Sequence, residues 1–193
     1  MPVTNLLVVR HGETKANEKG IEAGPLDYPL SKKGIKEVSF IAKKLAGTKI
    51  KAVYSSPVFR AIQTAKIIAS PHKLKVTTLE ELTEAKLKPE FVGKKGRHPI
   101  LVNPDAYLET NEELLKRTAS AISIIRRQAT GNVVAVSHGD VITALLENVV
   151  ERKVTTEKYY VIHPNPASLS IINLKARPTL VVFNYYRKML SGF

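Results

Sequence analysis

The strongest constraint on the fold is a recurring pattern, a short apolar run that ends in a polar turn. It occurs at residues 6–14, and again around 52–69 and 132–149, where a helical stretch follows the turn. In the first case Leu6 to Val9 are all apolar and end directly at Arg10. A strand that is apolar on both faces is typical of a parallel sheet covered on both sides. Alternation of such strands with helices predicts an α/β fold.

The rest of the chain continues this pattern, and no linker divides it into domains. Amphipathic stretches at 31–45 and 112–128 predict two further helices. Additional strand candidates, some of them expected to be antiparallel at an edge, are 76–79, 169–174 and 180–185. Between about 86 and 111 the pattern breaks into Pro, Gly and basic residues, which indicates an insertion over one end of the sheet. We therefore expect one domain over residues 1–193, a three-layer, doubly wound, mainly parallel sheet with helices on both faces.

Composition removes several classes of chemistry. The chain has no cysteine, which excludes a disulfide framework, a zinc ribbon, an iron–sulfur site and a thiol nucleophile. A chain of 193 residues is long enough to bury a core without such a staple. Any chemistry must therefore use oxygen and nitrogen.

The charge balance favours an anionic ligand. Lys and Arg number 30 against 17 for Asp and Glu, a formal charge of +13. Nucleic acid and a phosphorylated small molecule both fit this charge. No run of Lys or Arg exceeds two residues and no aromatic platform is evident, so we expect no nucleic-acid binding. No apolar run approaches the ~18 residues of a membrane span, and the N-terminal segment does not resemble a secretory leader. We expect a cytoplasmic protein without membrane attachment.

Polar side chains that suit phosphate stand where the strands are expected to end. Arg10 and His11 follow the first strand. Arg60 falls in the first turns of the helix after the second strand, and His138 follows a later one. Open α/β sheets bind ligands beyond the carboxyl ends of their strands. Guanidinium groups bind oxyanions bidentately, and an imidazole can act as a nucleophile or a donor. The set therefore predicts a phosphate site.

Other conspicuous residues carry weaker signals. Gly12 and Gly139 follow the two histidines, and we interpret them as turn residues that let the backbone approach an anion. No G-x-G-x-x-G fingerprint occurs, which argues against a nucleotide-binding loop. His72, His98 and His163 show no metal-ligand spacing. We therefore expect neither a metal ion nor a cofactor.

Five segments together point to a known family. They are LLVVRHGET (6–14), DYPLSKKG (27–34), SSPVFRAIQTA (55–65), VSHGDVI (136–142) and NPASLSII (165–172). In this order and combination they resemble the histidine phosphatase superfamily, also called the phosphoglycerate mutase-like fold. The ending NPASLSII is more similar to its phosphatase branch.

The resemblance implies a covalent mechanism. His11 would attack phosphorus in line and become a phosphohistidine, which water then hydrolyses. Arg10, Arg60 and His138 would surround the phosphoryl oxygens. Asn17 stands where the family has a polar residue of the phosphate pocket, and the backbone at the second histidine motif, at Gly139, would add to the pocket.

The resemblance also implies a carboxylic acid that protonates the leaving group. It comes from the segment after the third strand, where the letters Leu-Thr-Glu-Ala match best and select Glu84. Glu81 is the alternative. After Glu84 the family usually continues into a loop with Gly and Trp, whereas this chain reads KLKPEFVGKKG and has no tryptophan.

The leading hypothesis is a metal-independent phosphomonoester hydrolase that acts on a phosphorylated small molecule. The alternative is a phosphoglycerate mutase dependent on 2,3-bisphosphoglycerate, which would use the same pocket. A non-catalytic binding module is disfavoured because the Arg and His set is intact. Basic residues of the insertion, Lys94, Lys95 and Arg97, are expected to select substrates with a second negative group. The physiological substrate and the oligomeric state, a homodimer included, stay open.

Overall fold

The sheet is mainly parallel, as the sequence predicts. A computed structural model of the chain describes residues 2–96, 100, 103–150, 163–175 and 178–186. Within these residues a six-stranded sheet has the order β3-β2-β4-β1-β5-β6. Its strands are β1 (Val3–Arg10), β2 (Ile50–Ser55), β3 (Val76–Thr78), β4 (Gly131–Ser137), β5 (Leu169–Asn173) and β6 (Thr179–Tyr185). The first four are parallel, whereas β5 is antiparallel to its neighbours β1 and β6.

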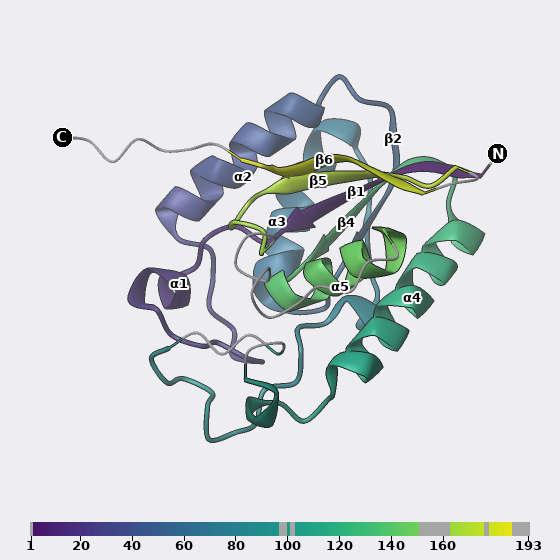
Figure 1. Cartoon of the computed structure of the whole chain (residues 1–193). Coiled ribbons are helices and arrows are strands. Elements are labelled where there is room, and N and C mark those ends of the chain that lie inside the picture. The colour runs from purple at the N-terminus through teal and green to yellow at the C-terminus, as the bar shows by residue number, and fades with distance from the viewer. Residues whose placement is uncertain (1, 97–99, 101–102, 151–162, 176–177, 187–193) are drawn as a thin grey trace.

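Helices cover both faces of this sheet (Figure 1). They are α1 (Lys15–Lys19), α2 (Lys32–Leu45), α3 (Phe59–Ala69), α4 (Asn111–Gln128) and α5 (Gly139–Val150). The short helix α1 was not expected from the sequence, because five residues are too few for a hydrophobic period. Helices α2 and α4 begin and end within one residue of the predicted stretches 31–45 and 112–128. Helices α3 and α5 follow their polar turns as expected.

Two core clusters explain the three layers. On β1 the buried Leu7 and Val9 belong to a cluster that includes residues of α2 and α3. Leu6 and Val8 belong to a second cluster, which includes residues of α4 and α5. Successive strand side chains point to opposite faces of a sheet, so an all-apolar strand is buried on both. The expected three-layer α/β architecture is thereby confirmed.

The strand register places the functional segments at one edge. Arg10 at the end of β1 pairs with Ser137 at the end of β4. Ser55 at the end of β2 pairs with Val136 of the same strand β4. The residues that follow these three strands therefore leave the sheet side by side.

Two isolated β-bridges hold the described part of the 86–111 insertion. Leu87 bridges to Tyr107 within the insertion, and Lys95 bridges to Ile21 in the segment after α1. Arg97 and His98 lie outside the described residues. In the part of the chain that the structure describes, no helix is both long and apolar enough to cross a membrane.

Backbone contact between the turn after β1 and helix α2 requires glycine. A Cβ on Gly12 would lie 2.7 Å from Val38 Cγ2 and 2.9 Å from the carbonyl oxygen of Gly34. A Cβ on Gly34 would overlap the backbone of Glu13. Close packing against α2 therefore requires glycine at position 12, a reason that was not predicted from the sequence; approach of this backbone to an anion stays a prediction.

We predict that Gly34→Ala lowers the free energy of unfolding by about 1–3 kcal/mol, because the added methyl group meets rigid backbone rather than a movable side chain. The matched control is Gly47→Ala in the turn after α2. Nothing lies within 4 Å of a Cβ at that position, so its stability should change little or rise slightly. Urea unfolding of the three proteins measures this, and equal midpoints for Gly34→Ala and the unaltered chain would contradict the packing argument.

Candidate active site

His11 stands directly beyond β1 with its ring in a buried cavity. Its Nδ1 lies 2.8 Å from the carbonyl oxygen of Gly12. A carbonyl can only accept a hydrogen bond, so Nδ1 carries the proton and Nε2 keeps its lone pair. Burial, together with the charges of Arg60 and Arg10, holds the pKa of His11 well below its usual range. His11 is therefore a neutral imidazole whose Nε2 is a potential nucleophile.

Arg60 reaches this nucleophile from the first turn of α3. Its side chain is only 2% exposed, and its Nε donates to His11 Nε2 over 3.3 Å. Its terminal nitrogens donate to the carbonyl oxygens of Gly24 at 3.1 Å and Leu26 at 3.3 Å. These carbonyls fix the guanidinium without neutralising it, so a buried positive charge stands beside His11.

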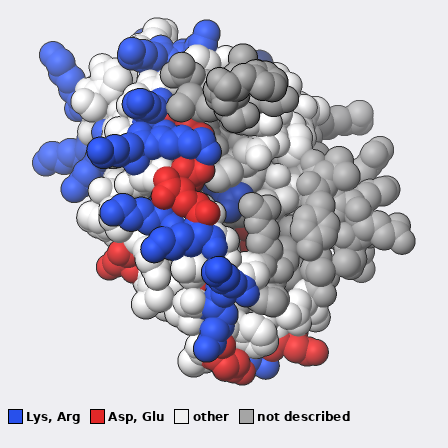
Figure 2. Space-filling model, turned by 90° about the vertical axis from the view of Figure 1, so that its left-hand side faces the viewer, with Lys and Arg blue, Asp and Glu red and all other residues white. Residues whose placement is uncertain are grey.

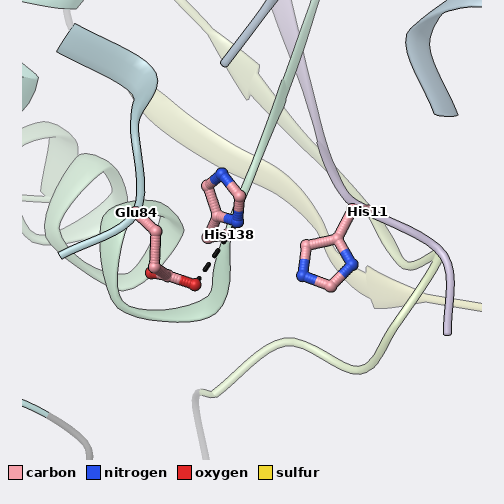
Figure 3. Close-up of side chains that lie close together, drawn as sticks. All are labelled: His11, Glu84 and His138. Atoms are coloured by element: carbon pink, nitrogen blue, oxygen red, sulfur yellow. Dashed lines mark ion pairs between the residues drawn. The ribbon is translucent and has the colours of Figure 1, made fainter. Parts of the chain in front are cut away.

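His138 follows β4, and its ring centroid lies 5.2 Å from that of His11. Its Nε2 is 2.8 Å from the hydroxyl of Ser56, and its Nδ1 is 3.3 Å from Oε2 of Glu84 (Figure 3). Burial and the nearby charge of Arg60 hold the pKa of His138 well below its usual range. The second histidine is thus also neutral, and Ser56 and Glu84 orient it from opposite sides of the ring.

Arg10 is held from the other side of the cavity. Its Nη1 donates to the carbonyl oxygen of Pro164 over 2.6 Å and lies 3.0 Å from His163 Nε2. The His163 ring also packs on Gly139, where any Cβ would overlap it. Glycine at 139 therefore makes room for His163, a reason for glycine that was not predicted from the sequence. Gly139 itself lines the cavity.

Sequence reasoning did not select His163, since no regular pattern leads to it. The signal for it was indirect: it lies two residues before the NPASLSII segment.

Asn17 lies in α1 at the cavity wall. Its Oδ1 accepts from the backbone N–H of Thr14 at 3.0 Å and from the Thr14 hydroxyl, while Thr14 caps the helix. This capping box explains why the short helix forms at all. Asn17 and Arg10 line the same two cavities.

Glu84 lines the cavity, whereas Glu81 does not line it. Glu84 Oε2 lies 3.8 Å from Arg60 Nη2, and Oε1 accepts from the N–H of Ala85 at 3.1 Å. Burial, with a smaller contribution from Asp140, raises the pKa of Glu84 to about 7, although Arg60 and Arg10 act in the opposite direction. Glu81 instead lines a separate outer cavity on the far side of Glu84.

The site consists of two adjoining cavities of about 100 and 70 Å³. Both are lined by Arg10, Asn17, Ile21, Glu22, Glu84, Tyr107 and Asp140. Tyr107 donates to Asp140 Oδ2 over 3.2 Å, and burial beside Asp140 raises its pKa, so the phenol stays protonated. Neither Tyr107 nor Asp140 was predicted as a site residue.

Of the three basic residues of the insertion that were expected at the site, the structure describes Lys94 and Lys95. Gly96 lines the larger cavity, but among the described residues Lys94 and Lys95 do not line either one. Figure 2 shows Lys and Arg side chains gathered over one face of the molecule, with acidic side chains among them. Selection of a second negative group by the insertion stays a prediction.

The charges around the two histidines suit an anion better than a cation. His11, Glu84 and His138 offer ligand atoms within 4.8 Å of one another, a spacing that a metal ion could use. Arg60 and Arg10 flank the same space. Two guanidinium groups beside one carboxyl repel a metal ion and attract a phosphoryl group. The geometry therefore supports the phosphate site that the sequence predicts.

Comparison with known proteins agrees with this geometry. The family model of the histidine phosphatase superfamily (branch 1) matches residues 6–185. The chain is 31% identical to a 2,3-bisphosphoglycerate-dependent phosphoglycerate mutase of Thermoplasma acidophilum, over 88% of this chain and 86% of the relative. It is 30% identical to a metal-independent phosphoserine phosphatase of Arabidopsis thaliana, over 74% of this chain and 67% of the relative.

A solved structure has the same fold. The phosphoserine phosphatase of Entamoeba histolytica, a histidine-to-alanine mutant in complex with phosphoserine, superposes with a TM-score of 0.79, with 23% identity over 94% of this chain and 96% of that one. The family model matches the chain from within β1 to the end of β6 and includes every residue that lines the two cavities. The chain therefore belongs to the histidine phosphatase superfamily, branch 1.

Proposed function

We propose that this protein hydrolyses phosphomonoesters of small molecules through a phosphohistidine on His11, without a metal ion or cofactor. The observation that carries the proposal is the neutral His11 Nε2 beside the buried guanidinium of Arg60, with a carboxyl of raised pKa in the same cavity. A nucleophile, charge stabilisers and an acid are the three groups that transfer of a phosphoryl group from an alcohol requires.

In the first step His11 Nε2 attacks phosphorus and forms an N–P bond. The bond from phosphorus to the alcohol oxygen breaks, and that oxygen takes the proton of Glu84. A pKa of about 7 keeps a large fraction of Glu84 protonated near neutral pH, where an ordinary glutamate would be ionised. Glu84 Oε2 lies 3.3 Å from His138 Nδ1, so the proposed acid stands beside the second histidine of the site.

In the second step water attacks the phosphohistidine. Glu84, now a carboxylate, takes a proton from this water, the N–P bond breaks, and His11 Nε2 regains its lone pair. Inorganic phosphate leaves, and the enzyme returns to its starting protonation state. One residue thus acts as acid and then as base.

Arg60, Arg10 and His138 stabilise the charge that spreads over the phosphoryl oxygens. The two guanidinium groups are already fixed by backbone carbonyls, so little reorganisation is needed when the substrate binds. When the Ser56 hydroxyl donates to Nε2 of His138, the imidazole proton is on Nδ1, where it can donate to a phosphoryl oxygen.

The relatives support hydrolysis and also one alternative. Among the similar proteins are a metal-independent phosphoserine phosphatase and a phosphoserine phosphatase bound to phosphoserine. The 31% identity to a phosphoglycerate mutase favours transfer of the phosphoryl group back to a second position of the substrate. Incubation with 3-phosphoglycerate separates the two. Phosphate release without 2-phosphoglycerate supports the hydrolase, and faster isomerisation than release supports the mutase.

We predict that rapid quench with labelled substrate gives an acid-labile, alkali-stable phosphoenzyme, because phosphohistidine has this stability. The label should be absent in His11→Ala. It should still form, more slowly, in His138→Ala, because His138 stabilises charge but does not bond to phosphorus. The reaction should proceed equally with a chelator present. Label that persists in His11→Ala would contradict the assignment of the nucleophile.

We predict that Glu84→Gln slows hydrolysis of alkyl phosphates by about 10²-fold or more and that of p-nitrophenyl phosphate far less, because a poor leaving group needs the proton most. In the unaltered enzyme kcat/KM for an alkyl phosphate should fall as pH rises through about 7, where Glu84 loses its proton. That fall should vanish in Glu84→Gln.

Glu81→Gln is the matched control, since this carboxyl lines the outer cavity. It should change neither the ratio between the two substrates nor the pH profile. The reverse pattern would move the acid role to Glu81.

A further inference from the structure

Arg117 of α4 holds the backbone on the N-terminal side of the proposed acid. Its Nη1 donates to the carbonyl oxygens of Glu81, at 2.9 Å, and Thr83, at 2.8 Å. One guanidinium nitrogen thereby bridges two carbonyls of the turn that leads into Glu84. Hydrogen bonds from a charged donor are stronger than those between neutral groups.

The same guanidinium is bound to Glu109, which holds the backbone on the other side of the acid. Nε and Nη2 of Arg117 donate to the Glu109 carboxylate over 2.8 to 3.2 Å. Glu109 Oε1 in turn accepts from the backbone N–H of Lys86 at 2.8 Å. Both flanks of Glu84 are therefore tied to one ion pair. We name Arg117 and Glu109 the clamp.

A third contact ties this turn to the strand that bears His138. The Ser137 hydroxyl donates to the carbonyl oxygen of Leu82 over 2.7 Å, and Ser137 is the last residue of β4. The acid and the second histidine thus have a common support. Glu84 Oε2 and His138 Nδ1 lie 3.3 Å apart above this support.

Glu84 needs such support because space is available on both sides of it. Its side chain, 23% exposed, lines the catalytic cavities and also the outer cavity of about 480 Å³. Rotation toward the outer cavity would take the carboxyl into a space lined by Lys86 and Lys116 and also by the acids Glu80, Glu81 and Glu113. There it would be better solvated, and it would no longer face the leaving group.

We propose that Arg117, through its ion pair with Glu109, is a positioning residue that keeps the Glu84 carboxyl in the catalytic cavity. The inference rests on the proposed acid role of Glu84. It assigns to the clamp no contact with substrate: Arg117 lines the outer cavity and is not among the residues that line the catalytic ones. Small misplacements of a reacting group have large effects on rate, about 10²-fold for 1 Å.

The test compares Arg117→Ala, Arg117→Lys and the control Lys116→Ala, the last on the same helix and at the same outer cavity. For Arg117→Ala we expect kcat for an alkyl phosphate to fall at least about 10-fold, with KM nearly unchanged. With p-nitrophenyl phosphate kcat should change by less than about 2-fold, because that leaving group scarcely needs the acid. Arg117→Lys should restore part of the loss, and Lys116→Ala should behave as the unaltered enzyme.

The double variant Arg117→Ala/Glu84→Gln decides whether the clamp acts through the acid. Once Glu84 cannot donate, loss of Arg117 should cost no further rate on the alkyl substrate, so the two effects should not add. Additive effects, or equal losses on both substrates, would overturn the proposal, because a merely structural role lowers all activities alike. If Arg117→Ala does not fold, Glu109→Gln gives the same comparison with the Lys86 bond retained.

The two proposals fail in different ways. Should Glu84→Gln itself leave the ratio between the substrates unchanged, the acid role falls, and the clamp with it. Should Glu84→Gln change the ratio and a folded Arg117→Ala not change it, only the clamp is overturned.

Discussion

The buried guanidinium of Arg60 is the group on which the rest of the site depends. It donates to His11 Nε2 and lies 3.8 Å from the Glu84 carboxyl. Its charge lowers the pKa of both histidines and partly offsets the rise in the pKa of Glu84. A positive charge buried away from water needs polar partners. The carbonyl oxygens of Gly24 and Leu26 accept hydrogen bonds from this guanidinium. These carbonyls do not neutralise the charge, so the proposed phosphoryl group would be the anion that balances it.

The fold brings these groups together by strand register rather than by local sequence. The ends of β1, β2 and β4 lie side by side because their pairing aligns Arg10 with Ser137 and Ser55 with Val136. Each strand is buried on both faces, so a shift of register would disturb both core clusters at once. The positions of His11 and His138 are therefore tied to the packing of the whole sheet, and the acid is tied to it through Ser137 and the clamp.

The sequence predicted the parallel strands and the cluster of Arg10, His11, Arg60 and His138, because hydrophobic period and strand-end position are local signals. Glu84 could be preferred to Glu81 only by resemblance, since the difference depends on which carboxyl a turn directs inward. His163 and Tyr107 were missed because long-range packing brings them to the cavity. The packing of Gly12 against α2 and of Gly139 against the His163 ring could not be foreseen, because both contacts join segments far apart in the sequence.

The proposed mechanism requires a neutral His11 with its proton on Nδ1 and an unprotonated Nε2, the atom to which Arg60 Nε donates. Long-range ¹H–¹⁵N spectra report the tautomer and the protonation of each imidazole, and the chain has only 5 histidines to assign. We expect His11 to show a protonated Nδ1 and an unprotonated Nε2 from neutral pH to well below 6.5. A His11 ring that becomes doubly protonated near pH 6.5, or one that carries its proton on Nε2, would contradict it.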